Sequence, residues 1–107
     1  MENQIYNYHA EMCKVFSHAK RLGLINLLRD KEMSAGELRK RLGLTPANLS
    51  QHLAMMRERH IIASRREGNV VYYRIANPRL IEACDLLREI LFEQIRQDAA
   101  LIQNRTS

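Results

Sequence analysis

Near its middle the chain carries local signals for two short helices separated by a tight turn. Ser34 is followed three residues later by Glu37, a spacing in which each side chain can cap a backbone N–H at a helix start. Gly43 is suited to end that helix, because glycine tolerates the left-handed conformation found after helix C-termini. Thr45 is a good N-cap and Pro46 fits the first helical position, so a second helix should begin at once. This pattern predicts a helix-turn-helix unit.

The second helix, expected near residues 45–59, combines an apolar stripe with a small, uncharged opposite face. Leu49, Leu53 and Met56 are spaced i, i+4 and i+7 and should face the core. A helix that enters the major groove of DNA benefits from short side chains and from groups that hydrogen-bond base edges. The candidate DNA contacts on this helix are Ala47, Asn48, Ser50, Gln51 and His52. Because His52 borders the apolar stripe, a structural role and a phosphate contact both stay open for it.

Two β-prone runs, residues 62–67 and 70–75, flank the pair Gly68-Asn69. A two-residue connection with glycine first is typical of a β-hairpin. Alternate residues of the second run are apolar and would share one face, which can cover the helices. The candidate contacts to flanking phosphates or the minor groove are Arg65, Arg66, Asn69 and Arg74. Arginines also occur on ordinary surface hairpins, so this interpretation depends on the neighbouring helices.

The positive charge of the chain is concentrated in this central part. Residues 34–75 contain eight lysines and arginines and three acidic residues, a net charge of +5 that equals the formal charge of the whole chain. Phosphate neutralisation supplies most sequence-independent affinity for nucleic acid, so this distribution predicts binding of double-stranded DNA through part of the surface. The sequence has no run of about 18 apolar residues to span a bilayer and no basic, aromatic-faced helix, so we expect no membrane partner.

Length and composition favour one globular domain. A chain of 107 residues can enclose one modest core, and its ordinary apolar and charged fractions argue against disorder. We therefore expect residues 1–107 to form a single winged helix-turn-helix domain, mainly α with a small β-hairpin, from about five helices plus a two-stranded wing. The start Met-Glu-Asn-Gln lacks the basic and apolar regions of a signal peptide, so we expect no export and a cytoplasmic location.

Apolar residues before and after the central part predict further helices. The N-terminal part carries Ile5, Met12, Val15, Phe16 and Ala19 near helical spacing, followed by an apolar run at residues 22–28. Asn77-Pro78 should start the last helix, whose stripe comprises Leu80, Cys84, Leu87, Leu91, Ile95 and Ile102. A helix near 25 residues spans about 37 Å, longer than so small a domain is wide. We therefore predict a two-fold homodimer through the first and last helices, bound to a roughly palindromic operator with half-sites about one helical turn apart.

With these residues in view, the chain resembles the ArsR/SmtB family of bacterial winged-helix repressors over nearly its whole length. The segments that carry the resemblance are His18–Leu28, Leu49–Leu53 and Arg65–Tyr73. The resemblance implies a dimeric repressor that leaves its operator when a metal, metalloid or thiol-oxidising signal is sensed. Carried over by position, it implies recognition-helix contacts from Ser50, Gln51 and His52 and wing contacts from Arg65, Arg66 and Asn69.

The metal sites of that family are incomplete in this sequence. Ser34 and Gly36 stand where many members carry a Cys-x-Cys pair, and they supply no thiolate. The zinc site of the last helix is reduced to one carboxylate, with Asn77, Arg79, Ile90 and Glu93 at its positions. Zinc needs about four ligands, so we expect neither site to bind metal and predict no cofactor.

The two cysteines are the remaining candidates for a sensing role. Cys13 belongs to the first predicted helix and Cys84 to the last, the two helices expected to meet at the dimer interface. A disulfide, persulfide or arsenite bridge between them could shift the angle between two DNA-binding units. His9 and Cys13 are four residues apart, so with Cys84 they form a weak candidate metal site. A cysteine on an apolar stripe is also a small hydrophobe, which leaves a purely structural role open.

Other classes of function are less well supported. Four histidines are scattered without a serine or cysteine partner at a recognisable spacing, and Gly-rich phosphate loops and HExxH pairs are missing, so we expect no enzyme. A winged helix that binds only protein stays an alternative, as does a regulator without an inducer. A protein-binding helix would expose aromatic or long apolar anchors, whereas this one has only Met55 at the edge of its outer face.

Overall fold

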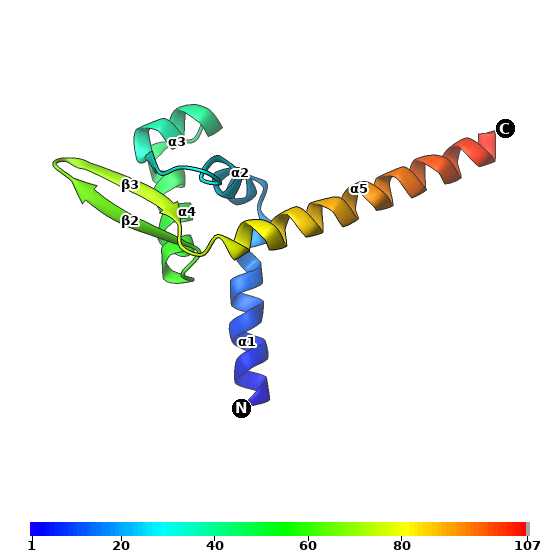
Figure 1. Ribbon diagram of the computed structural model, residues 1–107, viewed down its shortest axis with the longest axis horizontal. Coiled ribbons are helices and arrows are strands. Elements are labelled where there is room, and N and C mark those ends of the chain that lie inside the picture. Colours follow the sequence, from blue (N-terminus) through cyan, green and yellow to red (C-terminus); the bar gives the residue numbers. More distant parts are fainter. Residues whose placement is uncertain (107) are drawn as a thin grey trace.

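Five α-helices, one 3-10 turn and a three-stranded antiparallel sheet make up the computed structural model, which describes the backbone of residues 1–106 and the side chains of residues 1–100. Their order is α1 (Glu2–Cys13), η1 (Lys14–Ser17), α2 (Ala19–Leu27), β1 (Met33–Ser34), α3 (Ala35–Leu42), α4 (Pro46–Glu58), β2 (Ile62–Glu67), β3 (Val70–Ile75) and α5 (Arg79–Thr106). In Figure 1, α2, α3, α4 and the β2–β3 hairpin form one body, from which α1 and α5 extend in different directions. The predicted architecture of a mainly helical chain with a β-hairpin wing is confirmed.

The helix-turn-helix forms where its capping residues predicted it. The Ser34 Oγ accepts a hydrogen bond from the Glu37 N–H at 3.2 Å and so starts α3. Gly43 follows α3 with a φ of +63°, in the left-handed region that favours glycine. Thr45 Oγ1 then accepts from the Asn48 N–H at 3.2 Å and starts α4. Two N-caps and one left-handed glycine therefore set the three-residue connection between α3 and α4.

The hairpin also has the predicted bounds, and a short third strand extends its sheet. Strands β2 and β3 pair from Ile62 opposite Ile75 to Glu67 opposite Val70, and Gly68 turns the chain with a φ of +62°. The strand order is β1-β3-β2, because Met33–Ser34 pairs with the outer edge of β3. Two residues are too few for an alternating pattern, so β1 left no recognisable signal in the sequence. It ties the start of α3 directly to the wing.

The core lies between α2, α3, α4 and the base of the sheet. Its most completely buried side chains are Val15, Leu24, Leu28, Met33, Leu38, Met56 and Ile61. The predicted inner face of α4 is confirmed, since Leu49, Leu53 and Met56 are all buried. This core fixes α4 against the body with its opposite face turned to solvent.

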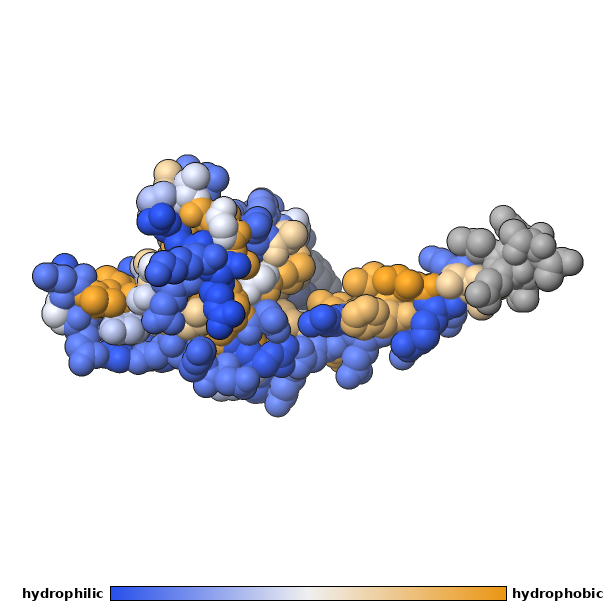
Figure 2. Space-filling view, turned by 90° about the horizontal axis from the view of Figure 1, so that it is seen from above, coloured by the Kyte–Doolittle hydropathy of each residue, from blue (hydrophilic) through white to orange (hydrophobic). Residues whose placement is uncertain are grey.

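The first and last helices leave apolar side chains uncovered. No residue of α1 is buried, and α5 contributes Leu80, Ile81 and Cys84 to the packing around the core. Farther along α5 the predicted stripe is exposed, with Leu91 and Ile95 each 51% exposed, and apolar surface runs along the helix in Figure 2. The side chain of Ile102, also predicted for this stripe, lies outside the described residues. The large exposed apolar residues of α1 and α5 are Ile5, Tyr6, Tyr8, Leu86, Leu87, Ile90, Leu91, Phe92 and Ile95.

Candidate nucleic-acid interface

The outer face of α4 is exposed, short-chained and uncharged over three turns. All of its small and polar positions are open to solvent, namely Ala47, Asn48, Ser50, Gln51 and Ala54. The charged side chains of α4 begin only at Arg57, in its last turn. A helix with this surface can approach the floor of the major groove closely and present hydroxyl and amide groups to base edges. Asn48 and Ser50 lie near the helix N-terminus, where backbone N–H groups favour phosphate.

His52 occupies the border between the outer face and the core and contacts α2. Its ring packs edge-on against the ring of His18, with centroids 4.7 Å apart, and its Nδ1 lies 3.5 Å from Nη1 of Arg21. Burial lowers the pKa of His52, and the positive charges of His18 and Arg21 lower it further. These contacts join α4 to the start of α2 through side chains.

The two adjacent wing arginines have different surroundings. Arg65 donates from Nε to both carboxylate oxygens of Glu32, at 3.0 and 2.9 Å, and from Nη1 to Oε2 of Glu67 at 2.9 Å. Arg66 is exposed and makes no ion pair with any carboxylate among the described side chains. Asn69 lies exposed at the hairpin tip. Of these two neighbours, the guanidinium of Arg66 is therefore free and that of Arg65 is occupied, while Arg74, the third predicted wing arginine, is exposed on β3.

Two residues of this region escaped sequence analysis. Glu32 lies in the loop before β1, and Arg21 on α2 donates to the backbone oxygens of Lys14 and Val15, at 2.9 Å each, besides lying near His52. The Glu32–Arg65 and Arg21–His52 contacts join residues 33 and 31 positions apart, for which neither periodicity nor a capping rule provides a signal. Additional exposed cations, Arg39, Lys40 and Arg41, lie in the last turn of α3.

The candidate sensing residues do not gather into one site within the chain. Cys13 is an exposed free thiol, whereas Cys84 is half-buried, and burial together with the charge of Asp85 raises the pKa of Cys84 despite the nearby Arg29. Within the described part of the chain, no group of three or more histidine, cysteine or acidic residues is placed to hold a metal ion, so His9, Cys13 and Cys84 do not form such a site in one subunit. The described helices also include none that is long and apolar enough to cross a membrane.

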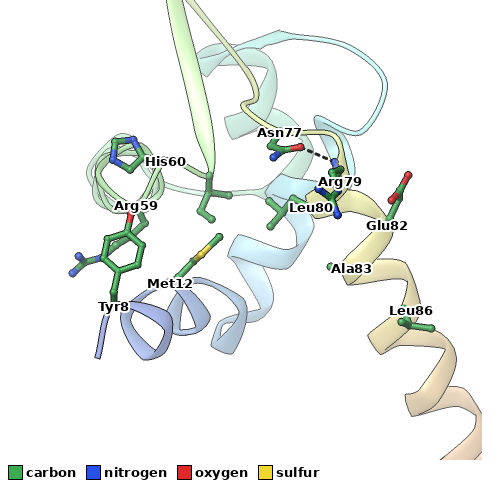
Figure 3. Close-up of a pocket in the computed structure, with 11 residues that line it drawn as sticks. Tyr8, Met12, Arg59, His60, Asn77, Arg79, Leu80, Glu82, Ala83 and Leu86 are labelled. Atoms are coloured by element: carbon green, nitrogen blue, oxygen red, sulfur yellow. Dashed lines mark hydrogen bonds between the residues drawn. The ribbon is translucent and has the colours of Figure 1, made fainter. Parts of the chain in front are cut away.

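A cavity of about 600 Å³ opens between α1, the turn after α4 and the start of α5. Figure 3 shows Tyr8 and Met12 projecting from α1 on one side and Leu80 and Leu86 on α5 on the other. Arg59 closes one wall and donates from Nη2 to Glu11 at 2.8 Å. The walls of this cavity are thus formed largely by α1 and α5, the two helices whose apolar side chains are exposed.

Comparison with known proteins decides the family. The model of bacterial regulatory proteins of the arsR family matches residues 18–64. The uncharacterised HTH-type transcriptional regulator Rv0081 of Mycobacterium tuberculosis is 33% identical over 106 residues, which cover 97% of this chain and 93% of that protein. The chain belongs to the arsR family. It is therefore a winged helix-turn-helix transcriptional regulator, as the resemblance implied.

Solved structures and further relatives agree with the arsR assignment. The crystal structure of Rv0081 has a TM-score of 0.83 and covers 89% of this chain and 96% of its own. A homodimeric winged helix-turn-helix domain from Mycobacterium bovis, 22% identical, shares the fold with a TM-score of 0.81 over 90% of this chain and 89% of that one. The transcriptional activator HlyU of Vibrio cholerae is 33% identical over 74% of this chain and 73% of its own, and the biofilm growth-associated repressor of Xylella fastidiosa is 33% identical over 85% and 80%. These arsR relatives thus include both an activator and a repressor.

Proposed function

We propose that the chain is a homodimeric repressor that places α4 in the major groove of a roughly palindromic operator and its wing against the flanking backbone. The observation that carries this proposal is the exposed, uncharged outer face of α4 beside a cationic hairpin. The base-contacting residues are Ser50 and Gln51, with Ala47 lying close to the bases and Asn48 near a phosphate. Arg66 and Asn69 extend the contact from the wing.

Dimerisation is proposed through the apolar surfaces of α1 and α5. Leu87, Leu91 and Ile95 form an exposed row on α5, and Ile5 adds an exposed apolar side chain on α1. Removing such surface from water is favourable at roughly 25 cal/mol per Å², so a second copy is a suitable cover. The M. bovis domain of the same fold is described as homodimeric, which supports a dimer. Two-fold symmetry would then present two α4 helices to successive major grooves.

For the effector, we propose that any signal is thiol-based rather than metal-based. Ser34, Gly36, Asn77 and Ile90 provide no soft-metal or imidazole ligands at the family positions. Cys13 is the accessible thiol, whereas the raised pKa of Cys84 fits a packing role better than a reactive one. Operator binding compared with and without reductant, in the wild type and in Cys13→Ser and Cys84→Ser, tests this. Equal affinity in every redox state would leave a regulator without a thiol signal.

The operator is the direct test of the proposed function. Sequencing genomic fragments retained by the purified protein should yield one palindromic motif. Gln51→Ala should then weaken operator binding by about 1–3 kcal/mol and relax preference at one base pair, since the lost amide contacts a base edge. An unrelated duplex of equal length serves as the control, and its affinity should barely change. A uniform loss on both duplexes would contradict base recognition by Gln51.

A protein-binding module is the competing function for the same fold. It would need apolar anchors on the outer face of α4, whereas Met55 is half-buried there and the exposed positions are small or polar. Failure to retain any DNA sequence above background, with the dimer intact, would favour this alternative. The proposal includes no catalytic activity, and it places the protein in the bacterial cytoplasm with its DNA.

A further inference from the structure

The guanidinium of Arg65 has all three of its nitrogens engaged within the protein. Nε and Nη2 donate to the carboxylate of Glu32, and Nη1 donates to Glu67. The guanidinium carbon also lies 4.7 Å from the ring centroid of Tyr72. Bidentate arginine–carboxylate pairs are among the stronger and more directional ionic contacts, and the aromatic face adds a cation–π contribution. Arg65 is thus held by two carboxylates and by the face of one aromatic ring.

Arg65 and Arg66 project from opposite faces of the wing. In the β2–β3 register Arg65 is opposite Tyr72 and Arg66 is opposite Val71, and successive side chains of a strand alternate between faces. The face of Arg66 is continuous with that of Tyr73 and Ile75, which pack against the core near the helices. The face of Arg65 is the one turned away from the core. Arg66 therefore shares a side of the sheet with the recognition helix, and Arg65 does not.

The outer face of the wing is close to electrically neutral. Glu32 and Glu67 lie beside Arg65, and the charge of Arg74 also acts on Glu32. The hydrogen bond from Arg65, with the charges of Arg65 and Arg74, lowers the pKa of Glu32, so this carboxylate stays ionised at neutral pH. A phosphate that approached Arg65 would find only the remaining N–H groups of Nη1 and Nη2, and there it would lie beside the carboxylates of Glu32 and Glu67, which repel it. Phosphate binding to Arg66 meets no such repulsion, because Arg66 makes no ion pair with a carboxylate among the described side chains.

We infer that Glu32 is a positioning residue that withholds Arg65 from DNA and leaves Arg66 as the phosphate-binding arginine of the wing. The inference rests on the proposed DNA-binding function and names the wing residue through which it works. Glu32 belongs to the loop before β1, so the same contact joins the α2–α3 side of the body to β2. Arg65 thus attaches the wing to the body of the protein, and Arg66 binds the phosphate backbone of the DNA.

The salt dependence of DNA binding separates the two arginines. The affinity of the full chain for one duplex of arbitrary sequence would be measured over a range of salt concentrations for wild type, Arg65→Gln, Arg66→Gln and Glu32→Gln. Each phosphate contact adds about 0.9 to the slope of log affinity against log salt for each subunit bound. Arg66→Gln should lower the slope by that amount, whereas its matched neighbour Arg65→Gln should leave it unchanged. Glu32→Gln should tighten binding and raise the slope by up to the same amount, because it releases Arg65.

Two results would overturn the inference while leaving DNA binding intact. One is an Arg65→Gln slope reduced as much as that of Arg66→Gln. The other is weaker binding by Glu32→Gln, which would mean that Glu32 only supports the wing. The Arg65 Nε–H resonance in the free protein provides a readout without DNA, and Glu32→Gln should accelerate its exchange with solvent. A wild type that shows no salt-dependent binding to any duplex would instead overturn the proposed function, and this inference with it.

Discussion

At the scale of single residues, His52 connects α4 to α2 through an imidazole ring whose surroundings favour its neutral form. It lies edge-on to His18 and beside the guanidinium of Arg21, and it is half-buried. Burial and two positive neighbours all disfavour the imidazolium form, which explains why the pKa of His52 is lowered. Protonation would place like charges between α2 and α4. A neutral His52 therefore supports the packing of α4 on α2 that the buried side chains of α4 establish.

The first prediction concerns the pH dependence of stability. Because the folded chain holds His52 at a lowered pKa, the unfolded chain binds this proton first as the pH falls through about 6.5. The free energy of unfolding should therefore decrease below that pH, until the folded-state pKa is also passed. Urea unfolding at about pH 7.5 and 5.5 should show this loss, and His52→Gln should reduce it. The same loss in both proteins would exclude His52 as its source.

At the scale of elements, the start of α4 depends on one hydroxyl. Thr45→Ala should lower the free energy of unfolding by about 1 kcal/mol, because the Asn48 N–H loses its acceptor. Ser50→Ala is the matched control, since Ser50 lies inside α4 with its side chain in solvent, and it should change stability by less than about 0.5 kcal/mol. Chemical denaturation of both variants gives the comparison. A Ser50→Ala loss as large as that of Thr45→Ala would contradict the capping role.

The same elements explain which features could be predicted from the sequence. Ser34, Thr45 and Gly68 act on backbone within a few residues, so their caps and turn could be predicted with correct bounds. The Glu32–Arg65 contact joins residues 33 positions apart, and strand β1 exists only because β3 provides an edge for it. Such pairings depend on the folded chain as a whole. The arginines of the wing could therefore be found from the sequence, but their different environments could not.

At the scale of the whole molecule, α5 is anchored at one end and uncovered along most of its length. Ile81 is its one buried side chain among the described residues, and Asp85 accepts two hydrogen bonds from Arg29, at 2.8 and 2.6 Å. From Leu86 to Ile95 its large apolar side chains are exposed to solvent, and the chain extends 62 Å along its longest axis. Ile81 and the Arg29–Asp85 ion pair thus attach the start of α5 to the body that carries α4.

The last prediction tests that seam with two lysines on one helix. Leu91→Lys places a charge in the exposed apolar row of α5, whereas Glu89→Lys places one on its opposite, polar side. Light scattering should find a monomer for Leu91→Lys and a dimer for Glu89→Lys, because only the first charge would be buried by a second copy. Operator affinity should fall at least tenfold for the monomer, since a single α4 reaches one half-site. A Leu91→Lys protein that stays dimeric with wild-type operator affinity would place the seam elsewhere on the molecule.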